Sequence, residues 1–181
     1  MKIKKRYRLL IVATSLFIAD FGLTWYFLTY TPYVREGNSL FSIDGGYLSL
    51  VANLIYLIIA FLIGLKIERY DTVIVEARNS FDYFKKLFTM DRTDFIYISY
   101  LTAFIYATFA SRLSVVMDWI IYGIYQETFF STQYSIIRNE MPFGRVDIVV
   151  ALLSFLLFSI LWYSSEFRKS KKILARRKKI G

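Results

Sequence analysis

The stretch YLSLVANLIYLIIAFLIGL, Tyr47–Leu65, contains no charged side chain. A helix needs about 20 apolar residues to cross the ~30 Å hydrocarbon layer of a bilayer, so this stretch predicts a transmembrane helix. Three other apolar stretches are similar, and the four predicted spans cover about residues 9–30, 47–65, 97–122 and 146–165. The predicted fold class is therefore all-α, a polytopic membrane protein with four transmembrane helices.

The composition supports this fold class and excludes several kinds of binding site and catalytic mechanism. Of the 181 residues 56% are hydrophobic, and the mean hydropathy is +0.44. The sequence has no Cys and no His. This excludes disulfides, thiol nucleophiles and histidine-based triads, as well as the usual haem and zinc ligands. We expect no metal and no cofactor, so any catalysis has to use carboxylates, hydroxyls, Lys, Arg or Tyr.

Lys and Arg are unevenly distributed between the predicted loops. The first eight residues carry five, residues 66–94 carry six and residues 167–181 carry eight, whereas the two other loops carry three between them. Four spans place the three basic segments on one side, which the positive-inside rule makes cytoplasmic. We predict a cell-membrane protein with both termini cytoplasmic. Residues 1–166 form the four-helix transmembrane domain, and residues 167–181 form a basic cytoplasmic tail.

The two longer basic segments have their own patterns. In the loop 66–94, Phe81, Phe84 and Phe88 recur at helical spacing among charged residues. This predicts a short amphipathic helix that either lies on the membrane interface or packs against the bundle. The net charge of +9 and the basic tail fit this topology and attraction to anionic lipid headgroups. An acidic partner or ribosomal RNA is the alternative for the tail, although we expect no nucleic acid.

Four charged residues lie in or at the edge of the spans: Asp20, Arg112, Asp118 and Asp147. Such residues are costly in a membrane and usually face protein or water, with a partner. One interpretation is structural. In it, Asp20 and Arg112 form an interhelical ion pair, Asp118 is interfacial, and the helix dipole favours Asp147 at the start of its helix.

A second interpretation is catalytic. The third span runs outward and the fourth runs inward, with a short outer loop between them, so Asp118 and Asp147 are expected to meet near the outer surface. Two nearby carboxylates do not both ionise easily. One then holds a proton while the other acts as a base, which is the arrangement that activates water for peptide hydrolysis.

Several motifs resemble those of signal peptidase II, the lipoprotein signal peptidase family. VVMDWIIYGIY (115–125) and PFGRVDIVVALLSFLLF (142–158) are similar to its third-span and fourth-span motifs, and ADFGLTWYFL (19–28) and REGNSLFSI (35–43) to its first-span and outer-loop motifs. Val115 and Trp119 stand where the family has Asn and Arg. The resemblance implies a four-span fold with catalytic Asp118 and Asp147. In the resulting peptidase hypothesis Asp20, Asn38 and Arg112 position a membrane-anchored peptide substrate.

Other functions stay open at this stage. The first half of the sequence also resembles small uncharacterised prokaryotic membrane proteins through Asp20, Thr24 and the Glu36–Asn38 turn, which implies no activity. A non-catalytic accessory subunit or adaptor with partner membrane subunits is the alternative to the peptidase. An ion pathway that uses Asp20 and Arg112 as a relay is a third hypothesis, although four spans without a repeat are few for a transporter.

Overall fold

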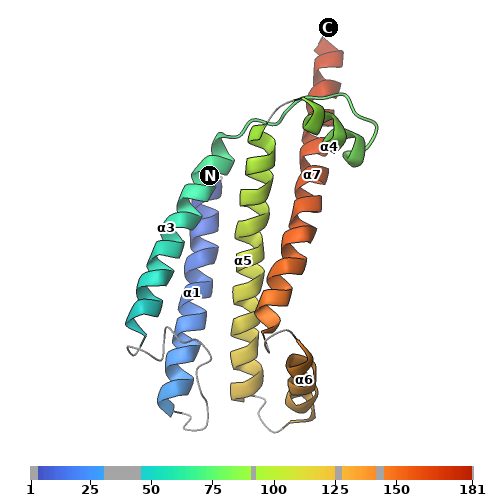
Figure 1. Cartoon of the computed structure of the whole chain (residues 1–181). Coiled ribbons are helices and arrows are strands. Elements are labelled where there is room, and N and C mark those ends of the chain that lie inside the picture. Colours follow the sequence, from blue (N-terminus) through green and yellow to red (C-terminus); the bar gives the residue numbers. More distant parts are fainter. Residues whose placement is uncertain (1–3, 31–45, 91–92, 125–127, 142–144, 181) are drawn as a thin grey trace.

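The computed structural model describes residues 4–30, 46–90, 93–124, 128–141 and 145–180 (Figure 1). All regular structure in these ranges is helical: α1 (Lys5–Tyr30), α3 (Tyr47–Arg69), α4 (Ser80–Thr89), α5 (Thr93–Ile124), α6 (Phe129–Glu140) and α7 (Val146–Ile180). The helices α1, α3, α5 and α7 are long and apolar enough to span a membrane. The predicted all-α class and its four candidate spans are thereby confirmed.

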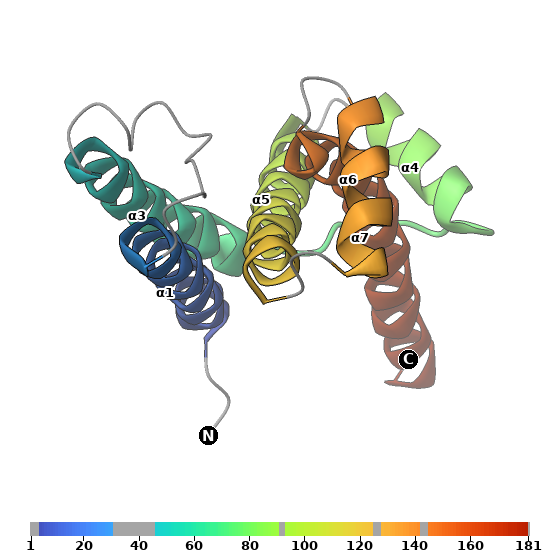
Figure 2. The same ribbon diagram turned by 90° about the horizontal axis from the view of Figure 1, so that it is seen from below.

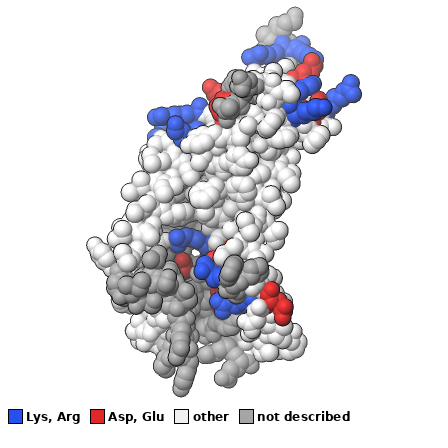
Figure 3. Space-filling view, in the orientation of Figure 1, with Lys and Arg blue, Asp and Glu red and all other residues white. Residues whose placement is uncertain are grey.

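The helix α5 lies at the centre of the arrangement. It packs against α7 on one side and against α1 and α3 on the other, while α1 and α3 also pack together (Figure 2). The beginning of α1, the end of α7 and the helix α4 lie at one end of the bundle, which we call the basic end, and α6 lies at the opposite end (Figure 1). Lys and Arg gather at the basic end, and a second group, mixed with Asp or Glu, lies toward the opposite end (Figure 3).

The helices α1 and α3 approach closely because of a glycine. A Cβ atom at Gly64 would lie 2.6 Å from the Cα atom of Arg6, so the backbones could not come this near with any larger residue. The Arg6 N–H donates to a carboxylate oxygen of Glu68 at 3.0 Å, which satisfies a backbone donor in the first turn of α1. An apolar cluster from three helices fills the interior beside them: Leu9, Ala13, Ala60, Ile63, Ile67, Ile105 and Phe109.

The last helix continues through the segment predicted to be a separate tail. α7 runs unbroken from Val146 to Ile180, so the segment predicted as a basic tail continues the last helix. The extended segment 70–78 crosses α7 and is bound to it: Thr72 Oγ1 donates to buried Glu166 at 2.7 Å, and the Val75 N–H donates to Ser170 Oγ at 2.9 Å. These bonds hold α7 where it passes the end of the bundle.

The predicted amphipathic helix exists as α4, and it packs against the bundle. The buried side chains are Tyr83 and Leu87, both 0% exposed, rather than the predicted phenylalanine stripe. Phe84 is half-buried and meets Tyr163 of α7 edge-on at 4.8 Å, whereas Phe81 and Phe88 are exposed. Of the two open alternatives, packing against the bundle is the one observed.

A helix that was not predicted lies between α5 and α7. The connection expected to be a short loop includes the 12-residue helix α6. Its N-cap is Thr128, whose hydroxyl oxygen accepts from the Ser131 N–H at 3.2 Å. Its composition is too polar for a membrane span, so a search for apolar stretches passes over it.

Candidate functional site

The predicted site residues fall into two places in the bundle. Asp20 and Arg112 form an ion pair between α1 and α5, with 3.2 Å between Arg112 Nη1 and Asp20 Oδ2. The Arg112 guanidinium also lies 4.8 Å from the centre of the Tyr56 ring of α3. Arg112 of α5 thus contacts both α1 and α3. The ion pair with Asp20 is the contact that the structural interpretation predicts. Asn38 lies outside the described residues.

Asp118 and Asp147 belong to a second group, which we call the polar end cluster. It comprises Asp118 on α5, Tyr134 and Arg138 on α6, and Arg145 and Asp147 at the beginning of α7. The charges that act on Asp118 include those of Arg138, Asp147 and Arg145. The structure therefore brings both predicted carboxylates to the α6 end of the bundle.

Each carboxylate of the cluster has a donor of its own. Arg145 binds Asp147 through both oxygens, with Nε to Oδ1 at 2.8 Å and Nη2 to Oδ2 at 2.7 Å. The Tyr134 hydroxyl donates to Asp118. Asp147 is 8% exposed and sits in the first turn of α7, where the helix dipole also favours a negative charge. Arg145 thus binds both oxygens of Asp147, and Tyr134 binds one oxygen of Asp118.

Three members of the cluster were not predicted from the sequence. Tyr134 and Arg138 are four residues apart on α6 and so share one face of it. Because α6 was taken for a loop, that spacing carried no signal. Arg145 was counted only as a loop charge, although an Arg two residues before an Asp at a helix start is a local pairing that the sequence could have indicated.

A stacked aromatic pair lies at the same end of the bundle and joins α1 to α5. Phe27 of α1 stacks on Trp119 of α5, with ring centroids 5.6 Å apart and planes inclined by 9°. Gly123 leaves room for the Phe27 ring, because a Cβ atom there would lie 1.8 Å from a ring carbon. Trp119 and Gly123 of the third-span motif thus pack α1 against α5 beside Asp118.

Acidic side chains in the described part of the chain do not gather as a metal site would require. No group of three or more Asp or Glu residues within the described ranges could hold a metal ion. In the polar end cluster Asp147 pairs with Arg145, and Asp118 accepts from the Tyr134 hydroxyl.

Comparison with known proteins found no matching family model, curated protein or solved structure. The class of the protein therefore follows from its own architecture. It is an α-helical protein with four helices compatible with multiple membrane passes, with charged side chains paired between those helices.

Proposed function

We propose that this protein is a non-catalytic accessory subunit or adaptor of the cell membrane, with both termini cytoplasmic, that presents a rigid basic helix to an acidic surface of a cytosolic partner protein. The observation that carries the proposal is the continuation of α7 beyond the bundle. We call its described residues 167–178 the basic arm. Figure 1 shows this end of the chain projecting past the other helices.

The length of α7 supports this role. At 1.5 Å per residue a helix crosses ~30 Å of hydrocarbon in about 20 residues, from Val146 to near Ser165. Arg176 and Arg177 lie about 17 Å further along the helix, whereas the headgroup layer is only about 5–8 Å thick. Because attraction to lipid charges decays over ~8 Å at physiological salt, the end of the arm suits a cytosolic partner better than a headgroup.

The anchoring of the arm supports it further. Exposed cations surround the arm: Arg168, Lys169, Lys171, Lys172, Arg176, Arg177 and Lys178. The Ser170 side chain is fully buried. Its hydroxyl accepts from the Val75 N–H and donates to the Val75 carbonyl oxygen. Lys178 pairs with Glu76 of the same extended segment at 2.9 Å. A helix held at Ser170 and again at Lys178 keeps its charges in a fixed pattern, which lowers the entropic cost of binding.

The test measures the size of the complex that the full chain forms when it is released from membranes in a mild neutral detergent. We expect a discrete complex larger than the 21.4 kDa chain with its detergent. The variant Lys171→Glu/Lys172→Glu/Arg176→Glu/Arg177→Glu should lose it, and so should Ala175→Pro, which breaks the arm but keeps its charge. The variant Lys171→Arg/Lys172→Arg is the control and should keep it. A complex unaffected by charge reversal would refute the proposal.

A second candidate, the aspartate-dyad peptidase acting on membrane-anchored peptides at the outer face, is favoured by the shared location of Asp118 and Asp147 in the polar end cluster. For catalysis one water must reach both carboxylates. Asp118→Asn and Asp147→Asn should each abolish cleavage of a membrane-anchored reporter peptide, while Glu140→Gln, an exposed position on α6, should not. Cleavage that survives both aspartate substitutions would exclude the dyad.

A further inference from the structure

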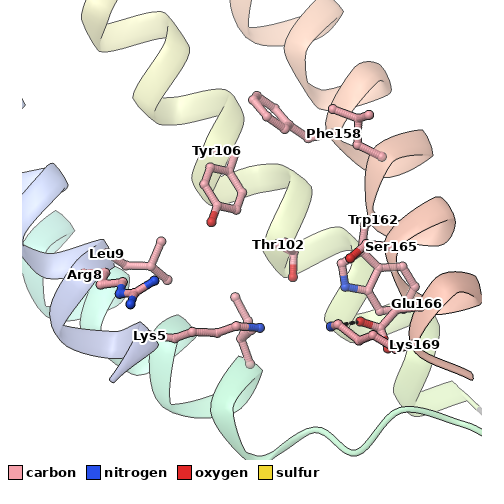
Figure 4. A pocket seen from close by; sticks show the side chains of 12 residues that line it. Lys5, Arg8, Leu9, Thr102, Tyr106, Phe158, Trp162, Ser165, Glu166 and Lys169 are labelled. Carbon is pink, nitrogen blue, oxygen red and sulfur yellow. Dashed lines mark hydrogen bonds and ion pairs between the residues drawn. The ribbon is translucent and has the colours of Figure 1, made fainter. Parts of the chain in front are cut away.

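A groove on the side of the bundle lies between α1 and α7, with α5 as its floor (Figure 4). It encloses about 300 Å³ near the basic end. Figure 2 shows α1 and α7 standing apart beside α5. The groove is not part of the polar end cluster, which lies at the other end of α5.

The part of the groove nearest the basic end is cationic. Lys5 and Arg8 of α1 and Lys169 of α7 line it, and all three are exposed. Figure 4 shows Lys5 reaching across the space between α1 and α7 toward Glu166 and Lys169. Buried Glu166 binds Lys169 and accepts from Thr72, so it offsets one of the three positive charges. Glu68, another acidic group acting on Lys5, is bound by Arg6.

The part of the groove farther from the basic end is apolar. Its walls there are Tyr106 of α5 and Phe158, Leu161 and Trp162 of α7. If the hydrocarbon layer ends near Ser165, Phe158 lies about 10 Å inside it, within one leaflet, and Lys169 lies about 6 Å outside it, at the level of the headgroups. The change from cationic to apolar therefore follows the direction in which a phospholipid changes from headgroup to acyl chain.

We infer that this groove is a binding site for one anionic phospholipid, with its phosphate between Lys5, Arg8 and Lys169 and an acyl chain along Phe158 and Leu161. Basic pockets between membrane helices at the cytoplasmic side suit such headgroups. A free anion would use the cations but leave the apolar wall uncovered. The inference rests on the four helices crossing a membrane and not on what the basic arm binds, so either can fail alone.

The test measures how many lipids the purified full chain retains in neutral detergent, and how tightly, by native mass spectrometry. The probes are dioleoyl phosphatidylglycerol, dioleoyl phosphatidylcholine and inorganic phosphate. We expect one phosphatidylglycerol to bind at least about tenfold more tightly than phosphatidylcholine, and inorganic phosphate not to displace it. Equal binding of the two lipids, or displacement by inorganic phosphate, would overturn the inference.

Two matched variants locate the site. Lys5→Gln/Arg8→Gln removes two groove cations and leaves the Lys169–Glu166 pair intact, while Lys171→Gln/Lys172→Gln removes two charges from the arm outside the groove. We expect the first variant to weaken phosphatidylglycerol binding by at least about tenfold and the second to leave it unchanged. Equal losses in both variants would show attraction to net charge and would overturn the inference.

A third variant tests the apolar half of the groove without changing any charge. Ser165→Phe places a ring among the lining residues and should also weaken phosphatidylglycerol binding, because the acyl chain and the ring compete for the same space. Circular dichroism and elution as a single species confirm that each variant is folded. Unchanged binding by a folded Ser165→Phe variant would contradict the proposed position of the acyl chain.

Discussion

The pair of Arg112 and Asp20 shows how charged side chains are paired between two helices that are apolar enough to span a membrane. Both side chains are about a quarter exposed, at 24% and 22%, and Arg112 also lies over the Tyr56 ring. The Tyr56 hydroxyl in turn bonds Thr108 of α5 at 2.9 Å. Each charge of the pair offsets the other, and the pair connects α1 to α5. Pairing of this kind lowers the cost of placing a charged side chain in an apolar helix.

Removing both members of this pair should cost less than the sum of the two single removals. Arg112→Ala leaves the Asp20 carboxylate without its cation, and we expect a loss of about 3 kcal/mol in the free energy of unfolding, the low end for buried pairs because both groups keep some exposure. Asp20→Asn/Arg112→Gln should cost less than the sum of its single changes. Unfolding titrations in mixed micelles measure the cycle, and strictly additive costs would show that the two residues do not interact.

Two glycines provide a matched test of close helix packing. Gly64→Ala should destabilise the bundle by about 1–3 kcal/mol, because its Cβ would strike the backbone of Arg6. At Gly22 a Cβ atom would meet nothing within 4 Å, so Gly22→Ala should be neutral or stabilising by up to about 1 kcal/mol through helix propensity. Thermal unfolding measures the stability of both variants. Equal changes in stability would show that Gly64 is not needed for the close approach of α1 and α3.

At the scale of elements, α4 illustrates what periodicity does and does not predict. The spacing of Phe81, Phe84 and Phe88 correctly indicates a helix, yet the side facing the bundle is that of Tyr83 and Leu87. Tyr83 is preferred there because its hydroxyl donates to the Val73 carbonyl at 2.8 Å while its ring is buried beside Phe167. Only the course of the segment 70–78 creates that partner.

The stability of the first turn of α4 should depend on pH. The Arg78 N–H donates to Asp82 and, with Lys86 nearby, holds the pKa of the Asp82 carboxyl below its usual range. A lowered pKa means that the carboxylate stabilises the folded helix above the unfolded pKa of about 4, and that this contribution is lost as the pH falls through the lower folded value.

We therefore expect the amides of the first turn of α4 to lose protection from hydrogen exchange as the pH falls below about 4, after correction for the intrinsic exchange rate. The effect should be modest because Asp82 is exposed to solvent. Asp82→Asn should lower protection at neutral pH and remove the dependence on pH. A pH dependence that persists in Asp82→Asn would assign it to another group.

At the scale of the whole molecule, the position of the ends makes the topology testable. The first turn of α1, the helix α4 and the end of α7 lie at the basic end, and α6 lies at the other (Figure 1). Because the chain has no cysteine, single cysteines can be introduced as reporters. We expect Lys85→Cys and Ala175→Cys to react with a membrane-impermeant thiol reagent only from the cytoplasmic side, and Asn139→Cys only from the outer side. Labelling of Asn139→Cys and Ala175→Cys from the same side would refute the four-span topology.

Much of the architecture follows from the sequence by itself. The four helices that are long and apolar enough to span a membrane, and the gathering of basic residues at one end, both follow from local composition. The neighbourhood of Asp118 and Asp147 follows from the same topology, because consecutive antiparallel spans bring the end of one helix near the start of the next.

The tertiary structure decided which donor each of these side chains binds. Arg145 and Tyr134 bind the two carboxylates, α6 supplies Tyr134 from a segment without apolar periodicity, and Ser170 binds Val75 from 95 residues away. Local sequence cannot specify such contacts, because a hydrogen bond depends on the positions of two groups to within about 0.5 Å, and packing between distant helices sets those positions. For the same reason the groove between α1 and α7 became visible only when both helices were placed on α5.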